Sequence, residues 1–143
     1  MRALLDVNVL IALFDANHVR HDDARAWLEG SIDHGWASCP ITQNGFLRII
    51  TTPAYPAPIP FGQAVELLAD ATATRWHQFW PDDVSLLSAS LIRHDRIHGP
   101  KQITDSYLLA LAVAHEGRFV TFDRHISVDT VHGARKANLT VID

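Results

Sequence analysis

Cysteine is nearly absent from this sequence, and its scarcity excludes two classes of small protein. Cys39 is the only cysteine among 143 residues. A single cysteine cannot form an intramolecular disulfide, and it cannot supply the several thiolates of a cysteine-based zinc site. We therefore expect neither a disulfide-stapled domain nor a zinc ribbon, and a reducing cytoplasm suits the chain.

Long hydrophobic runs are also lacking. No uninterrupted apolar run approaches the roughly 18 to 20 residues that span a bilayer. Asp6 stands where a secretory signal would still be running through its apolar core. We expect no signal peptide, no membrane span and a cytoplasmic location.

The chain has no excess of positive charge. Its 16 acidic residues outnumber its 12 Lys and Arg residues, which gives a formal net charge of −4. This balance argues against a protein that holds nucleic acid mainly through a broad basic surface. RNA is still allowed as a substrate, because metal ions held by carboxylates can bridge to phosphate groups.

Short apolar runs alternate with amphipathic segments along the whole chain. Hydrophobic residues make up 48% of the sequence, enough for one well-buried core, so we expect a single domain over residues 1–143. Strands are predicted at 3–5, 36–39, 76–80, 118–123 and 139–142. Helices are predicted at 9–14, 21–29, 43–50, 61–73, 84–98 and 105–117. Such alternation indicates an α/β fold with a central parallel β-sheet covered on both faces.

Several predicted boundaries rest on single residues. Gly30 should interrupt the second helix, and Pro40 should end the second strand. Thr42 and Thr104 are expected to cap the helices that follow them. The segment 52–60 contains four prolines and is predicted to be an extended loop within the domain.

Three aspartates occupy positions that suit a metal site. Asp6 and Asp123 directly follow apolar strand runs, and Asp105 opens the most apolar helix. The carboxyl ends of parallel strands meet at one edge of a sheet, so all three carboxylates should lie close together. Clustered carboxylates resist ionisation unless a cation lies between them, which indicates Mg²⁺ or Mn²⁺.

Each acid also has a structural interpretation. Asp105 is favoured at a helix start by the helix dipole, Asp123 suits a turn, and Asp6 can cap a helix that begins near Asn8. His94 and His98 raise a separate hypothesis, a zinc-dependent hydrolase, because they lie one helical turn apart with an acid between them. The C-terminal dipole of the predicted helix favours the same histidines without any metal.

Three sequence blocks surround the aspartates: Leu5-Asp6-Val7-Asn8-Val9-Leu10-Ile11, Ile103-Thr104-Asp105-Ser106-Tyr107-Leu108-Leu109-Ala110-Leu111-Ala112 and Val120-Thr121-Phe122-Asp123-Arg124. These blocks resemble the signatures of PIN-domain nucleases, and in particular those of the VapC toxins of bacterial toxin–antitoxin pairs. The resemblance covers nearly the whole chain, in the family's order and spacing. It implies a three-layer α/β/α PIN-like domain.

The resemblance also implies an activity and its partners. An endoribonuclease is expected in which Asp6, Asp105 and Asp123 bind Mg²⁺ or Mn²⁺ and carry catalysis. Asn8 and Thr121 would orient carboxylates or water. A VapB-type antitoxin and a second copy of the chain are the implied partners, and the apolar helices at Gln43 to Ile50 and Phe61 to Ala73 offer surfaces for them.

One departure from the family pattern concerns a glutamate usually found at the start of the helix after the second strand. Gln43 or Gly45 stands where it is expected, depending on the alignment. Gln43 keeps a carbonyl oxygen for a cation but lacks the charge. A catalytically weak domain that binds RNA or an antitoxin-like partner without cutting is therefore the main alternative.

Basic residues supply candidates for RNA contact. Arg48, Lys101 and Arg124 are the cations expected to hold RNA phosphates near a negatively charged site.

Overall fold

A computed structural model describes all 143 residues and contains one sheet of five parallel strands in the order β3-β2-β1-β4-β5. The strands are β1 (Ala3–Leu5), β2 (Trp36–Ser38), β3 (His77–Phe79), β4 (Arg118–Thr121) and β5 (Leu139–Val141). The α-helices are α1 (Val7–Phe14), α2 (His21–Ser31), α3 (Pro40–Ile50), α4 (Phe61–Thr72) and α5 (Ile103–Ala114). The 3-10 turns are η1 (Ile32–His34), η2 (His94–Arg96), η3 (Pro100–Gln102), η4 (Val128–Thr130) and η5 (Lys136–Asn138).

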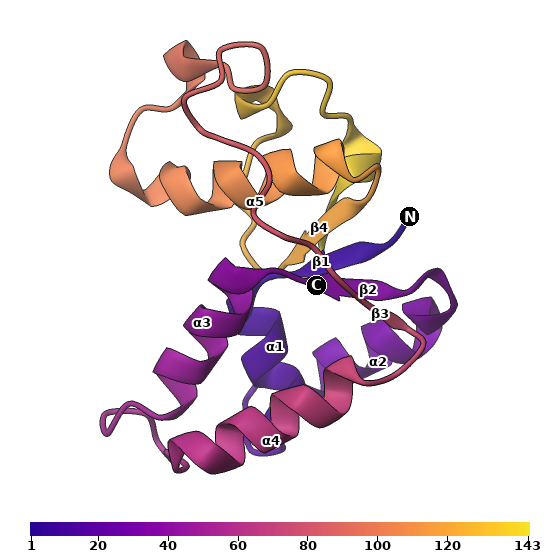
Figure 1. Cartoon of the computed structure of the whole chain (residues 1–143), viewed down its shortest axis with the longest axis vertical. Helices are drawn as coiled ribbons and strands as arrows, with labels where there is room; N and C mark the ends of the chain where they lie inside the picture. The colour runs from indigo at the N-terminus through magenta and orange to yellow at the C-terminus, as the bar shows by residue number, and fades with distance from the viewer.

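Helices cover both faces of the sheet. Helices α1 to α4 lie on one side and α5 on the other (Figure 1). Neighbouring residues of β1 point to opposite sides, since Leu5 belongs to the apolar cluster with Phe46 whereas Leu4 belongs to the cluster with Leu109. The three-layer α/β/α fold with a parallel central sheet is therefore confirmed. None of the helices has the length and apolar content needed to cross a membrane.

The pairing of β1 with β4 sets the geometry of one sheet edge. Leu5 is in register with Val120, and the backbone N–H of Asp6 donates to the Val120 carbonyl at 2.9 Å. Because the two strands are parallel, the residues that follow each of them emerge side by side. This edge collects the ends of β1 and β4, which are distant in sequence.

The helix predicted over residues 84–98 is wrong. This segment forms turns and only the short η2. Its serines explain the difference, because Ser85 accepts a hydrogen bond from the Leu87 backbone N–H and so competes with helical pairing. Its apolar side chains, among them Val84, Leu91 and Ile92, pack singly into the cluster beside α5.

Three predicted helix boundaries were also wrong. Helix α2 continues through Gly30 to Ser31. Helix α3 begins at Pro40, whose fixed φ suits a first helical position, and Thr42 contacts Cys39 from the third position instead of capping the helix. Helix α5 begins at Ile103, one residue before Thr104.

Candidate active site

Asp6 leaves β1 and caps α1 at the same time. One carboxylate oxygen, Oδ1, accepts the backbone N–H of Val7 at 2.8 Å, so the structural interpretation of this residue as a cap is confirmed. The other oxygen, Oδ2, accepts the Thr121 hydroxyl at 2.7 Å. The carboxylate that caps α1 is therefore also held at the end of β4 by the Thr121 hydroxyl.

Thr121 connects two of the three aspartates. Its hydroxyl donates to Asp6 and accepts the backbone N–H of Asp123 at 3.1 Å. Asp123 lies in a turn, where its Oδ1 accepts the backbone N–H of His125 at 2.8 Å. The turn interpretation of Asp123 is thus confirmed as well, and the turn places this acid beside Asp6.

Asp105 lies in the first turn of α5 and completes a group of three interacting acids. Burial, followed by the negative charges of Asp6 and Asp123, raises the pKa of Asp105 to about 6. Burial also raises the pKa of Asp6, with a smaller contribution from Asp123, although hydrogen bonds from Thr121 and Val7 oppose the shift. The charges of Asp6 and Asp123 therefore make Asp105 harder to ionise.

The negative charge of this group has almost no fixed counterion. Neither lysine nor arginine pairs with Asp6, Asp105 or Asp123, and the single ion-pair contact comes from the exposed His125 ring at 3.2 Å from Asp123. Three hard oxygen donors with unbalanced charge suit Mg²⁺ or Mn²⁺. No three or more His, Cys, Asp or Glu side chains are arranged to hold a metal ion as they stand. The fit therefore rests on donor chemistry and charge, and the carboxylates would have to draw together around an ion.

A pocket of about 300 Å³ opens beside two of these acids. Helix α5 and the turn before it form one wall, and the loop after Asp123 forms the other. Its lining residues are Lys101, Gln102, Asp105, Ser106, Asp123, His125, Ile126, Ser127 and Thr130. A larger, open groove of about 560 Å³ lies elsewhere, between α3 and Phe61.

Neutralising Asp105 should stabilise the metal-free protein at neutral pH. The pKa of this carboxyl in the folded chain, about 6, exceeds its ordinary value of 3.8. Between these two pH values the folded state therefore binds more protons than the unfolded state does. The stability that comes from this proton binding is lost as pH rises through that range. We expect Asp105→Asn to raise the melting temperature at pH 7.5 by roughly 2 to 4 °C, since solvent screens a half-buried carboxylate.

The control for this experiment is Asp22→Asn, which alters an exposed acid in the first turn of α2. Thermal unfolding in EDTA at pH 7.5 and pH 4.5 measures both variants. The benefit of Asp105→Asn should shrink at pH 4.5, where the native carboxyl is already protonated. An equal benefit at both pH values, or the same benefit from Asp22→Asn, would contradict the electrostatic origin.

The remaining sequence candidates on α1 and α3 are placed differently. Asn8 is exposed on the first turn of α1 and its side chain makes no hydrogen bond. Gln43 is tied to the sheet, because its Nε2 donates to Ser38 Oγ at 3.0 Å. Gly45 faces Val7, and a Cβ atom at this glycine would lie 2.6 Å from Val7 Cγ2. Helix α3 thus provides no fourth acid.

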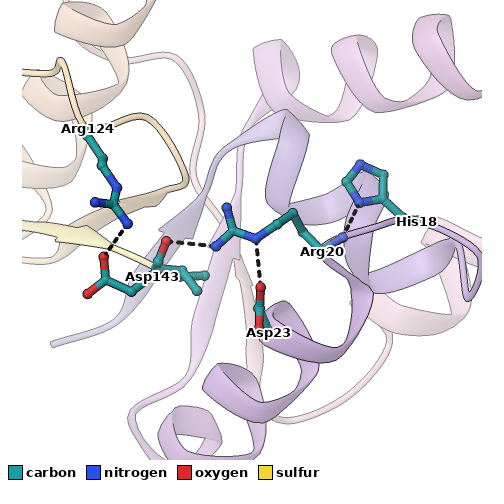
Figure 2. A network of polar contacts seen from close by, with 6 residues as sticks. His18, Arg20, Asp23, Arg124 and Asp143 are labelled. Carbon is teal, nitrogen blue, oxygen red and sulfur yellow. Dashed lines mark hydrogen bonds and ion pairs between the residues drawn. The ribbon is translucent and has the colours of Figure 1, made fainter.

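The three cationic candidates differ in their surroundings. Lys101 lines the pocket beside Asp105, and Arg48 lines the groove beside Phe61. Arg124 donates to Asp143 Oδ1 at 3.0 Å, while Arg20 donates to the Ile142 carbonyl at 3.1 Å and fixes the chain end from the other side (Figure 2). Lys101 is therefore the cation best placed to meet a phosphate near the acids.

The helix predicted to place His94 and His98 as a zinc-binding pair does not form. His94 lies in η2, and its Nε2 donates to the Leu86 carbonyl at 2.7 Å, so this nitrogen has no lone pair to offer a metal. His98 is exposed beyond η2. The helical spacing of the two histidines, on which the zinc hypothesis depended, is therefore absent.

Sequence reasoning missed two polar residues of the pocket. Ser106 directly follows Asp105, and this adjacency was the available signal. Thr130 reaches the pocket through η4, a short turn that leaves no periodic pattern in the sequence. Both side chains are buried.

Comparisons with known proteins identify relatives over nearly the full chain. The family model described as "PIN domain" matches residues 3–128. Ribonuclease VapC44 of Mycobacterium tuberculosis is 59% identical over 142 residues, covering 99% of this chain and 100% of the relative. Ribonuclease VapC39 of the same organism is 43% identical, covering 86% of this chain and 89% of the relative.

A solved structure shows the same fold at low sequence identity. It is the complex VapBC2 from Rickettsia felis, bound to a DNA fragment from the promoter of the pair. The likeness has a TM-score of 0.57 at 15% identity, and it covers 86% of this chain and 89% of that one. At this identity the comparison supports the architecture alone.

Proposed function

We propose that this chain, which belongs to the PIN-domain family and within it to the VapC ribonucleases, is an endoribonuclease that depends on Mg²⁺ or Mn²⁺. The observation that carries the proposal is the group of Asp6, Asp105 and Asp123, in which burial and then the charges of Asp6 and Asp123 raise the pKa of Asp105 while no lysine or arginine pairs with the group. Such a group is costly to the folded chain unless a cation joins it. We propose all three as metal ligands and catalytic residues.

The side chains around the acids would position the reacting groups. A divalent ion bound here supplies an activated water and neutralises charge that develops on a phosphodiester. Thr121 holds the Asp6 carboxylate and the backbone after β4 in one arrangement, which limits the reorganisation needed during cleavage. Lys101 lies at the pocket where a phosphate of the RNA backbone would pass.

The test is cleavage of a total RNA pool by the purified chain. We expect discrete fragments with Mg²⁺ or Mn²⁺ and none in EDTA. Equal cleavage in EDTA would contradict metal dependence. An absence of cleavage under all three conditions, with the protein folded, would favour the second candidate function below.

The second candidate is a PIN domain that binds RNA or an antitoxin-like partner without cutting. Helix α3 favours it, because Gly45 lies against Val7 and Gln43 is bonded to Ser38, so neither supplies the family's glutamate. The remaining three acids carry one charge fewer than the family pattern. Weaker metal affinity, or binding of a single ion, would follow.

The partner surface is proposed on α3 and α4. Phe61 and Val65 of α4 are 63% and 38% exposed, and Phe61 borders the groove along α3. Exposed apolar side chains beside a groove suit a protein contact, and we propose a VapB-type antitoxin and a homodimer as its users. Sedimentation of the purified chain tests this, since a stable monomer with and without the antitoxin would contradict it.

A further inference from the structure

We infer that the pocket beside Asp105 and Asp123 receives one unpaired nucleobase next to the phosphate that is cut, and that Ser106 and Thr130 recognise it. The inference rests on the proposed function, because it names how the same site would choose its RNA. The pocket lies against two of the three acids, and a nucleotide adjoining the cut would reach it.

Ser106 provides the first argument. The residue is only 3% exposed overall and it lines the pocket, and its hydroxyl makes no hydrogen bond within the protein. The hydroxyl is not one of the fully enclosed polar atoms that lack a partner, so it is open to the pocket. In an α-helix a serine can bond back to the preceding turn, and Ser106 does not, which leaves its hydroxyl available to a molecule in the pocket.

The opposite wall supplies the second polar group. Thr130 is also buried, and its hydroxyl makes only one long contact, 3.4 Å to the Ser127 carbonyl. Two of the other polar residues in the lining are already engaged. Gln102 accepts the His98 backbone N–H at 2.6 Å, and Ser127 accepts the backbone N–H of Asp129 at 3.1 Å. Two hydroxyls on facing walls therefore remain free to bond a base edge.

The pocket is formed before any ligand arrives. The backbone N–H of Arg93 donates to the Thr130 carbonyl at 2.9 Å, and that of His132 donates to the Leu91 carbonyl at 2.8 Å. These bonds fix the loop after β4 to the segment before α5. A rigid wall can discriminate between bases because it does not adapt to each one.

A base is favoured over a second phosphate by the charge of the walls. Asp105 and Asp123 would repel an additional anion, and Lys101 is the only lysine or arginine of the lining. A volume of about 300 Å³ lies at the lower limit of small-ligand pockets and suits one base rather than a base pair. Ile126 offers an apolar contact and the exposed His125 ring can stack on a base. Sequence-specific recognition of RNA commonly uses such unstacked bases.

The experiment maps cleavage ends across an RNA pool and measures kcat/KM on short oligonucleotides that differ at one base beside the cut. Wild type should prefer certain bases at one adjacent position. In Ser106→Ala and Thr130→Val that preference should fall by roughly 2- to 10-fold, the amount expected from one lost hydrogen bond. Alanine suits a helix at least as well as serine, so Ser106→Ala should fold.

Ser90→Ala is the matched control, since this exposed hydroxyl contacts only Ser88 and lies outside the pocket. A pocket-filling variant, Ser106→Leu, should abolish the preference and lower kcat/KM. If wild type cuts RNA but shows no base preference beside the cut, or both hydroxyl variants keep it unchanged, the base pocket is overturned and the ribonuclease stands. If wild type cuts no RNA, both proposals are overturned.

Discussion

Replacing Asp6 with asparagine should reduce RNA cleavage by more than about 100-fold while leaving the chain folded. Loss of a residue that merely orients a metal ligand typically costs about 10- to 100-fold, and Asp6 is proposed as a ligand itself. Asparagine caps a helix as well as aspartate does, so the bond to the Val7 backbone N–H can be retained. The variant therefore separates the chemical role of Asp6 from its structural role.

The measurement combines cleavage rates with thermal unfolding. Mg²⁺ or Mn²⁺ should raise the melting temperature of wild type through preferential binding to the folded state, and should do so much less in Asp6→Asn. Thr121→Val, which removes the hydroxyl between Asp6 and Asp123, should lose about 10- to 100-fold in rate. Asp22→Asn should match wild type. If Asp6→Asn cleaves RNA at the wild-type rate, the proposed role of Asp6 as a metal ligand and catalytic residue is contradicted.

Placing the family's glutamate at Gly45 should destabilise the protein. A Cβ at this position would lie 2.6 Å from Val7 Cγ2, closer than packed carbon atoms allow. Valine is branched at Cβ and has little rotamer freedom in a helix, so α1 and α3 must move apart. We expect Gly45→Ala and Gly45→Glu to lower the free energy of unfolding by about 1–3 kcal/mol.

Two controls identify the contact as the cause. Gly30 also lies within a helix, but a Cβ there meets nothing within 4 Å, so Gly30→Ala should stabilise by about 0.5–1 kcal/mol. In a Val7→Ala background the space opens, and Gly45→Ala should become neutral or stabilising. Urea denaturation measures all five variants. A loss of stability that persists in the Val7→Ala background would show that another contact excludes side chains at Gly45.

Local sequence patterns predicted the sheet and its acidic edge well. All five strands are found where short apolar runs stand, and Asp6 follows β1 as expected because strand ends in a parallel sheet face one edge. The same patterns failed over residues 84–98, where apolar residues at helical spacing pack individually and serines bond to the backbone. The spacing of apolar residues shows which side chains can be buried, but it does not fix the backbone conformation. In residues 84–98 tertiary packing determines that conformation.

The contacts around the three acids were harder to predict from the sequence than the acids themselves. Thr121 was identified because it lies two residues before Asp123, whereas its bond to Asp6 depends on the pairing of β1 with β4. Ser106 and Thr130 line the same pocket, and backbone bonds to residues 91 and 93 fix the wall that carries Thr130. Such long-range contacts leave no local signal. The tight contact of Gly45 with Val7 is likewise visible only between two packed helices.

The hydrogen bond between Thr121 and Asp6 joins residues 115 positions apart. A chain is synthesised from its N-terminus, so Asp6 leaves the ribosome early and waits for β4, the fourth of five strands. We expect a nascent chain that has not yet emerged through β4 to be unable to cut the RNA that surrounds it, because Thr121 and Asp123 are not yet beside Asp6. A chain that stopped before β4 would carry Asp6 without the partners that complete the group of acids.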